Sequence, residues 1–167
     1  MQYYYSYQTP IGEIWLVEED NFIVKLKYEI DDVKGIKGIK ETETPLIKTT
    51  YHQLTEYFNG KRKTFDLPLK LKGTKFQQQV WSALQTIPYG EVWSYKHLAE
   101  VIENPRACRA VGNANNHNPV AIIVPCHRIV GIDGELVGYA GGLKIKKQLL
   151  DIEQNEITEV IRIIDIY

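Results

Sequence analysis

The sequence lacks the features of a membrane-spanning, secreted or zinc-dependent protein. No apolar run approaches the ~20 residues that a membrane-spanning helix needs. The first residues, with tyrosines at 3, 4 and 5, show neither the basic region nor the apolar stretch of a signal peptide. The two cysteines, Cys108 and Cys126, form no disulfide framework and have no zinc-ligand spacing. We therefore expect a cytoplasmic protein with two free thiols, no metal, no cofactor and no membrane contact.

A net charge of −1 gives no sign of a polyanionic partner, but the charge is unevenly distributed. Residues 1–60 carry a net charge of −4, and residues 151–167 also carry −4. Residues 61–150 hold 13 Lys/Arg against 6 Asp/Glu, which gives +7. A basic middle between acidic ends is compatible with binding nucleic acid. A solvated lysine surface is the alternative, and charge alone does not decide between the two.

With 167 residues the chain can form one domain or two small lobes that share a core. Residues 1–70 predict a small α/β lobe and a linker. Polar residues alternate with β-branched or aromatic ones in three runs separated by turns, which predicts an antiparallel meander. These runs are residues 3–7, 13–18 and 22–28. Residues 29–43 are interpreted as a polar connector. Thr44-Pro45 then starts an amphipathic helix that ends at Asn59-Gly60 and covers the sheet, and nothing in residues 1–60 suggests chemistry.

Residues 71–155 predict a mostly helical second lobe, and residues 156–167 a tail. A capping pattern at Thr74 starts one helix, which ends before Pro88. Ser94 caps a second helix, and Arg106 starts a third after an Asn-Pro turn. The last two helices have the outline of a helix-turn-helix. The tail either adds a strand or helix to the first lobe or merely stabilises it.

The third helix combines positive charge with small side chains. It offers Arg106 and Arg109 and no acidic residue. Its small residues are Ala107, Ala110, Gly112 and Ala114. Small side chains allow a backbone to approach a partner closely, which suits a groove of DNA. Many helix pairs bind nothing, so this pattern alone favours DNA only slightly.

The chemistry is expected at Cys126. The apolar run 120–124 predicts a buried strand that stops at Pro125, and Cys126, His127 and Arg128 follow directly. A free thiol is only a few per cent thiolate near neutral pH and needs a base or a cation beside it. Neighbouring residues on a strand point to opposite faces, so the chain must turn at Pro125-Cys126 or His127 must act through a water. An inert core cysteine is the alternative reading, which the proline before it and the polar residues after it disfavour.

The motifs from about residue 74 to 153 together resemble one known family, the O6-alkylguanine-DNA alkyltransferases, also called methylated-DNA–protein-cysteine methyltransferases. Each motif is weak alone, whereas their shared order and spacing are specific. They are Phe76-Gln77-Gln78-Gln79-Val80-Trp81, Ile87-Pro88-Tyr89-Gly90-Glu91-Val92, Ser94-Tyr95, Ala110-Val111-Gly112, Asn118-Pro119, Pro125-Cys126-His127-Arg128-Ile129-Val130, Tyr139-Ala140-Gly141-Gly142 and Leu149-Leu150-Asp151-Ile152-Glu153.

The resemblance implies a catalytic role for five residues. Cys126 would accept the alkyl group, while His127 takes the thiol proton through a water and Glu153 orients the imidazole. Asn118 would brace the active-site turn. Tyr95 would donate to a ring nitrogen of the leaving guanine and help to turn the nucleotide out of the helix.

The resemblance also implies how DNA and the flipped base are held. Arg109 would fill the gap that the flipped nucleotide leaves in the stack. The other residues assigned to DNA are Tyr95, Arg106, Ala110, Gly112 and Asn113. Those assigned to the base and its alkyl group are Cys126, Ile129, Tyr139 and Ala140. Serine often stands at the position of Ala140 in this family, so tolerance for bulky alkyl groups stays open.

The implied function is DNA repair by irreversible, single-turnover transfer from O6-alkylguanine, and less efficiently from O4-alkylthymine, in double-stranded DNA. We expect a monomer. Each molecule should react once, because a thioether is stable and the sequence offers no motif that would reverse its formation. Two alternatives remain. A protein that senses alkylated guanine without repairing it would lack the cysteine, and a cysteine hydrolase using Cys126, His127 and Glu153 would turn over without DNA. Cys108 is interpreted as a packing residue.

Overall fold

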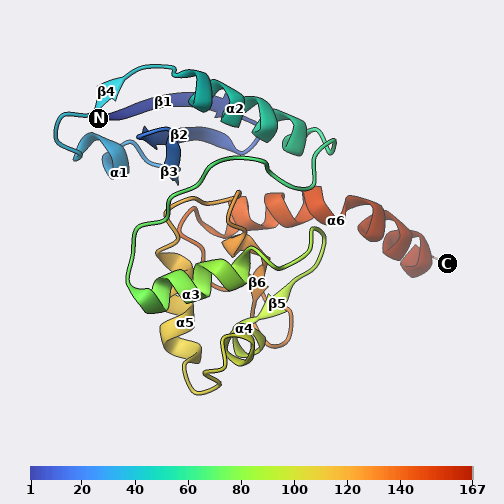
Figure 1. Ribbon diagram of the computed structural model, residues 1–167. Coiled ribbons are helices and arrows are strands. Elements are labelled where there is room, and N and C mark those ends of the chain that lie inside the picture. The colour runs from blue at the N-terminus through green and yellow to red at the C-terminus, as the bar shows by residue number, and fades with distance from the viewer. Residues whose placement is uncertain (167) are drawn as a thin grey trace.

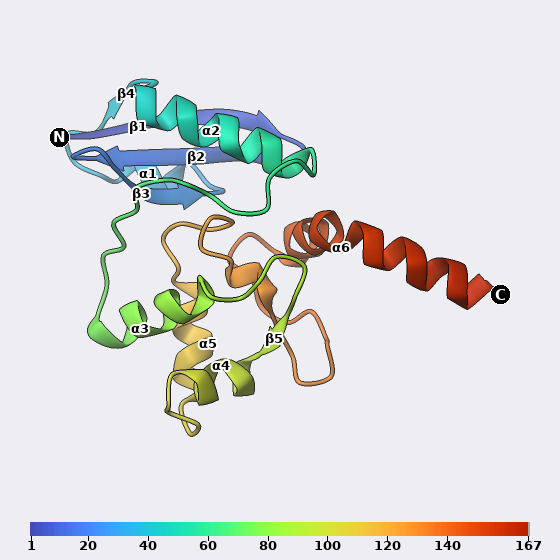
Figure 2. The same ribbon diagram turned by 45° about the vertical axis from the view of Figure 1, so that its right-hand side comes forward.

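The structure, a computed structural model, describes the backbone of residues 1–166 and the side chains as far as Gln154. It consists of two lobes, a sheet with helices and a mostly helical lobe, stacked one on the other (Figure 1). The predicted α+β class is therefore confirmed. The linker after the first lobe passes beneath the sheet and then descends to the second lobe, as both views show (Figure 2).

The first lobe is built on the predicted meander, which is confirmed. Its strands are β1 (Gln2–Thr9), β2 (Gly12–Glu19) and β3 (Phe22–Lys27), paired antiparallel. Asp20 and Asn21 form the second turn with φ of 52° and 67°, a left-handed conformation that these two residue types tolerate. Helix α2 (Pro45–Phe58) begins where predicted, because the Thr44 hydroxyl accepts a hydrogen bond from the amide of Ile47 at 3.1 Å.

The prediction of a polar connector at residues 29–43 is wrong in part, because this segment contains regular structure. It forms α1 (Asp31–Lys34) and β4 (Lys40–Glu41), and β4 adds to the sheet parallel to β1. The sheet order is therefore β3-β2-β1-β4. Val33 is fully buried against Val17 and Val24 on the sheet face opposite α2. One buried residue in one helical turn leaves too little periodicity to be read from the sequence.

The second lobe contains the three helices predicted above, in the predicted order, followed by a fourth helix. Its helices are α3 (Lys75–Leu84), α4 (Tyr95–Val101), α5 (Cys108–Asn116) and α6 (Leu143–Ile166). Two strands, β5 (Trp93–Ser94) and β6 (Ile129–Val130), pair in parallel. The backbone of α6 includes residues 156–166 of the expected tail, whose side chains, together with Tyr167, lie outside the described residues.

Helix α5 differs from the prediction at both ends. It begins at Cys108 rather than at Arg106, because residues 102–107 form the turn after α4. The run Asn113-Ala114-Asn115-Asn116 is polar and predicts a break in the helix, yet α5 continues through it. Buried contacts hold this end: the Ala114 carbonyl accepts a hydrogen bond from Trp81 Nε1, and Asn115 Nδ2 donates to the Cys126 carbonyl. Tertiary contacts override the weak helix propensity of asparagine here.

The two lobes share one hydrophobic core and are joined along β3. The core runs from Leu16 and Leu54 in the first lobe to Leu84 and Val124 in the second. The linker and the segment before the active site both bond to the β3 edge. The bonds are Ile23 N to Pro68 O at 2.8 Å, Lys70 N to Ile23 O at 3.1 Å and Leu26 N to Pro119 O at 2.9 Å. The lobes therefore act as one body around the segment that precedes Cys126.

Among the residues described, no helix is both long and apolar enough to cross a membrane.

Candidate active site

The segment before Cys126 is not the strand that the apolar run predicts. It folds into turns, with Ile122 at a φ of 71°, and Cys126–Arg128 form a short 3-10 helix. The Asn118 side chain causes this fold, because Nδ2 donates to the Val124 carbonyl at 2.7 Å while Oδ1 accepts from the Val120 amide at 3.0 Å. The Asn118 side chain thus bonds to backbone groups of Val120 and Val124 that in a strand would bond to a neighbouring strand. Cys126 and His127 are therefore carried by a tight turn.

The thiol of Cys126 is buried, with 4% of the residue exposed. Burial raises the pKa of Cys126, while the Asn118 side chain, the charge of Lys146 and the Tyr139 side chain oppose this shift. The thiol is consequently protonated at neutral pH. A reaction at this sulfur requires a group that takes the proton as the sulfur attacks.

His127 can serve as that group. Its Nε2 lies 2.5 Å from Glu153 Oε2, and both side chains are fully buried. Burial lowers the pKa of His127 although Glu153 opposes the shift, so the imidazole is neutral at pH 7. A carboxylate only accepts hydrogen bonds, so Nε2 must carry the hydrogen. Nδ1 then holds a lone pair, and it has no hydrogen-bond partner among the described residues.

Glu153, on α6, is held as a carboxylate by several donors. Besides His127, it accepts hydrogen bonds from Arg128 Nε at 2.7 Å and from the Tyr57 hydroxyl at 2.5 Å. Burial alone would raise the pKa of Glu153, but the hydrogen bonds from His127 and Arg128 and the charge of Arg128 outweigh it and lower the pKa to about 2. Arg128 Nη1 also donates to the Ile87 carbonyl at 2.7 Å. Arg128 therefore neutralises and orients the carboxylate.

Two tyrosines of the first lobe reach this site, although no residue of 1–60 was expected there. Tyr57 lies on α2 and is fully buried, with its hydroxyl on Glu153. Tyr28 follows β3, and its hydroxyl lies 2.5 Å from that of Tyr139. Tyr57 falls three residues after Leu54 on the buried stripe of α2. A buried tyrosine hydroxyl needs a polar partner, and this was the available signal for Tyr57.

The loop 137–142 borders the site through Tyr139 and is tied to α4 and α6. The Tyr95 hydroxyl, at the start of α4, donates to the Val137 carbonyl at 3.0 Å. Lys146, on α6, is fully buried, and its Nζ donates to the carbonyls of Val137 and Gly138, each at 3.0 Å. Burial lowers the pKa of Lys146 to about 8, although the Cys126 thiolate would raise it. The sequence of residues 136–139 predicts a short extended piece, but these residues form irregular backbone.

The remaining residues predicted for the base lie on this loop and on β6. Tyr139 is half-buried beside the thiol, and Ala140 is exposed. Ile129 is fully buried in β6, directly after the Cys126 turn, and pairs with Trp93 of β5. The structure therefore brings Cys126, Tyr139 and Ile129 into one neighbourhood, with Ala140 at its rim.

The residues predicted to bind DNA divide into two groups. Arg109, Ala110 and Asn113 are exposed along α5, and Arg106 is exposed in the turn before it. Gly112 instead faces α4, because a Cβ added there would lie 3.5 Å from the Tyr95 ring. Gly112 is thus the place where α5 approaches Tyr95 closely. No acidic residue lies between Arg106 and Asn116, so this surface is basic and otherwise neutral.

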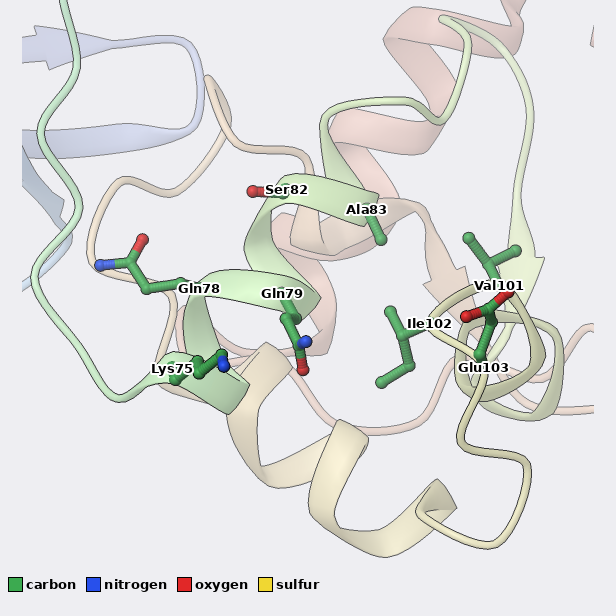
Figure 3. Close-up of a pocket in the computed structure, with 8 residues that line it drawn as sticks. All are labelled: Lys75, Gln78, Gln79, Ser82, Ala83, Val101, Ile102 and Glu103. Carbon is green, nitrogen blue, oxygen red and sulfur yellow. The ribbon is translucent and has the colours of Figure 1, made fainter.

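No predicted site residue lines the open hollow between α3 and the end of α4 (Figure 3). Its lining includes Gln79 of α3 and, from the end of α4, Ile102 and Glu103. Within the described part of the chain, no three His, Cys, Asp or Glu side chains gather in a way that could hold a metal ion.

Comparison with known proteins identifies family models that cover both lobes. The model described as 6-O-methylguanine DNA methyltransferase, DNA binding domain, matches residues 75–155. The model described as 6-O-methylguanine DNA methyltransferase, ribonuclease-like domain, matches residues 2–71. The two matches meet at the linker between the lobes.

Full-length relatives give the same result. A constitutive methylated-DNA–protein-cysteine methyltransferase of Bacillus subtilis is 46% identical over 159 residues, covering 92% of this chain and 96% of the relative. A methylated-DNA–protein-cysteine methyltransferase of Methanosarcina barkeri is 45% identical over 163 residues, covering 93% and 99%. The crystal structure of Mycobacterium tuberculosis OGT in complex with DNA is similar with a TM-score of 0.85 at 42% identity, covering 92% of this chain and 93% of that one.

Proposed function

The chain belongs to the 6-O-methylguanine DNA methyltransferase family, and on this premise we propose that it repairs DNA by moving the alkyl group of O6-alkylguanine onto its own Cys126. The observation that carries the proposal is the buried pair of His127 and Glu153, in which His127 directly follows Cys126 in the same 3-10 helix. Glu153 fixes the tautomer of a neutral His127, whose Nδ1 lone pair is left to accept a proton. A merely structural buried cysteine has no use for a base of this kind.

The proposed reaction is an in-line displacement at the alkyl carbon. The thiol proton passes through a bridging water to His127 Nδ1 as the sulfur attacks, and a sulfur–carbon bond forms. The carbon–oxygen bond breaks, and its electron pair moves to O6 and the purine ring. Tyr95 offsets that charge by donating its hydroxyl proton toward a ring nitrogen, for which it must leave the Val137 carbonyl. The thioether is stable, so each molecule reacts once.

The thiol can meet the alkyl carbon only if the nucleotide leaves the duplex. An alkyl group inside a stacked base pair is inaccessible to a buried sulfur, so base flipping is part of the proposal. The exposed, acid-free surface of α5 would face the duplex, and Arg109 would occupy the vacated place in the stack. Arg106, Ala110 and Asn113 would contact the backbone of the duplex, while Gly112 would position Tyr95. The enzyme would act as a cytoplasmic monomer on double-stranded DNA and, less efficiently, on O4-alkylthymine.

A transfer experiment tests the proposal. The protein is incubated with a duplex that carries labelled O6-methylguanine, and the label is located by peptide mapping. We expect label on Cys126 at no more than one equivalent, none in Cys126→Ser and an unchanged amount in Cys108→Ser. Absence of transfer would refute the proposal. Continued turnover without DNA would instead favour a cysteine hydrolase.

The role of Arg109 requires a comparison of two substrates. Arg109→Ala should slow transfer from the duplex far more than transfer from free O6-alkylguanine, because the free base leaves no gap in a stack. Arg106→Ala removes the same charge from the turn before α5 and is the matched control, with a smaller loss on the duplex. Equal losses on both substrates for Arg109→Ala would count against the plugging role.

A further inference from the structure

Tyr28 crosses the boundary between the lobes to contact the active-site loop. It follows β3 in the first lobe, yet its hydroxyl lies 2.5 Å from the hydroxyl of Tyr139. The two ring centroids are 5.9 Å apart, with the rings inclined at 56°. Burial raises the pKa of both tyrosines, so both hydroxyls stay protonated and one donates to the other. Tyr139 in turn lies beside the Cys126 thiol.

Tyr28 also packs on the backbone of the loop. A Cβ added at Gly141 would lie 2.6 Å from Tyr28 Cε2 and 3.0 Å from the Tyr139 ring. The loop can approach Tyr28 this closely only because residue 141 is glycine. Tyr95 and Lys146 hold the loop at Val137 and Gly138. The following residues of the loop, 139–141, are tied to the first lobe by the hydrogen bond between the hydroxyls of Tyr28 and Tyr139.

The direction of attack determines where a large alkyl group must go. In an in-line displacement the sulfur, the carbon and the leaving oxygen are collinear. The remaining substituents of the carbon therefore project sideways, toward the side chains that surround the thiol. Tyr139 is one of these side chains, and Ala140 adds no side chain beyond its methyl. The space for a substituent then depends on whether the Tyr139 ring can move.

We propose that Tyr28 is a specificity-determining residue that limits the size of the alkyl group accepted by Cys126, by fixing the ring of Tyr139 and the backbone at Gly141. This inference rests on the proposed function, since it concerns which alkyl groups that reaction accepts. A side chain of the first lobe thereby sets the selectivity of a reaction whose reacting atoms belong to the second.

The test compares two substrates in three proteins. Single-turnover rate constants are measured for duplexes with O6-methylguanine and with O6-benzylguanine, using the wild type, Tyr28→Phe and Tyr28→Ala. In Tyr28→Ala the benzyl-to-methyl ratio should rise about tenfold or more, the scale at which pocket size discriminates apolar groups. In Tyr28→Phe, which keeps the ring but frees Tyr139, the ratio should rise by a factor of about 2 to 10, as expected for one hydrogen bond.

The control is Tyr4→Ala, since Tyr4 packs on Trp15 at the opposite face of the sheet, and it should leave the ratio unchanged. A ratio equal to that of the wild type in both Tyr28 variants overturns the proposal, as does an equal fall of both rates, which a purely structural role would give. If Tyr28→Ala does not fold, the benzyl-to-methyl ratio of Tyr28→Phe alone tests the proposal, and a ratio equal to that of the wild type overturns it. Loss of methyl transfer in the wild type would refute the proposed function instead.

Discussion

The two lobes contribute to the site in different ways. The second lobe supplies the thiol of Cys126, the imidazole of His127 and the carboxylate of Glu153, all close to η1, the 3-10 helix of residues 126–128. The first lobe supplies tyrosine hydroxyls, from Tyr57 to Glu153 and from Tyr28 to Tyr139. The reacting groups are thus concentrated in one lobe, and the other restricts their movement. The four predictions below test whether this division holds.

Replacing Glu153 by Gln should have the largest effect. The rate of alkyl transfer should fall by about 100-fold, because His127 loses the partner that fixes its tautomer. The free energy of unfolding should fall by about 3 kcal/mol or more, because Arg128 is left buried without its counter-charge. Single-turnover kinetics and urea denaturation measure the two effects. Asp151→Asn, on the exposed side of α6, is the matched control and should change neither.

Acid should destabilise the protein through the same pair. The pKa of His127 lies below 6.5 in the folded protein because the ring is buried, so the unfolded chain binds a proton first as the pH falls. The pKa of Glu153 is lowered from 4.5 to about 2, since His127 and Arg128 outweigh its burial, so the unfolded carboxylate is also protonated first. Stability is therefore lost below pH 6.5 through His127 and between pH 4.5 and about 2 through Glu153.

Urea midpoints measured from pH 7 to pH 3 test this dependence. The wild type should lose stability in both windows, whereas Glu153→Gln should lose less in the lower one, where Glu19, whose pKa is lowered by its hydrogen bonds from Lys72 and Gln2, still contributes. A midpoint that stays constant over the whole range would contradict the charge states assigned to the pair.

Tyr57→Phe should have an intermediate effect. It removes one hydrogen bond to a buried carboxylate and should lower the free energy of unfolding by about 2 kcal/mol. The transfer rate should fall by less than in Glu153→Gln, because His127 and Arg128 still hold the carboxylate. Tyr51→Phe is the control on the same helix, because the Tyr51 ring stacks on the Tyr7 ring, with the two centroids 3.9 Å apart, rather than reaching Glu153. If Tyr57→Phe slowed transfer as much as Glu153→Gln, the proposed division between the lobes would fail.

Thr44→Ala should have the smallest effect on the reaction. It removes the cap of α2 and the hydrogen bond to the buried carboxylate of Glu18, and should destabilise the protein by about 3 kcal/mol. The transfer rate should not change, because the cap lies at the opposite end of α2 from Tyr57. Kinetics at a temperature well below unfolding check this, and a slower reaction would show that the first lobe influences the site through more than its tyrosines.

Local signals explain how much could be predicted from the sequence. Turn residues and alternation predict β1 to β3, and capping residues at Thr44, Thr74 and Ser94 predict three helix starts. Cys126 and His127 are neighbours in the chain, so a motif reveals them together. The relay glutamate at position 153 is distant, and only the resemblance to a family pointed to it.

What could not be predicted depends on contacts between distant residues. The apolar run 120–124 has the composition of a strand, but the Asn118 side chain supplies the hydrogen bonds that turn it into a loop. Tyr57 and Glu153 are 96 positions apart, and Tyr28 and Tyr139 are 111 apart. The place of Tyr57 on the buried stripe of α2 indicates that its hydroxyl needs a polar partner, but the local sequence of neither tyrosine identifies that partner.

The bond from Tyr57 to Glu153 limits how freely the lobes could be exchanged between relatives. A chimera that joins this second lobe to a foreign first lobe would keep Cys126, His127 and Glu153, and its site would look complete. The carboxylate would nevertheless lose a donor unless the foreign helix presents a hydroxyl at the position of Tyr57. Because of this contact, an exchange of lobes has to keep or rebuild the hydroxyl on Glu153, although the reacting atoms all belong to one lobe.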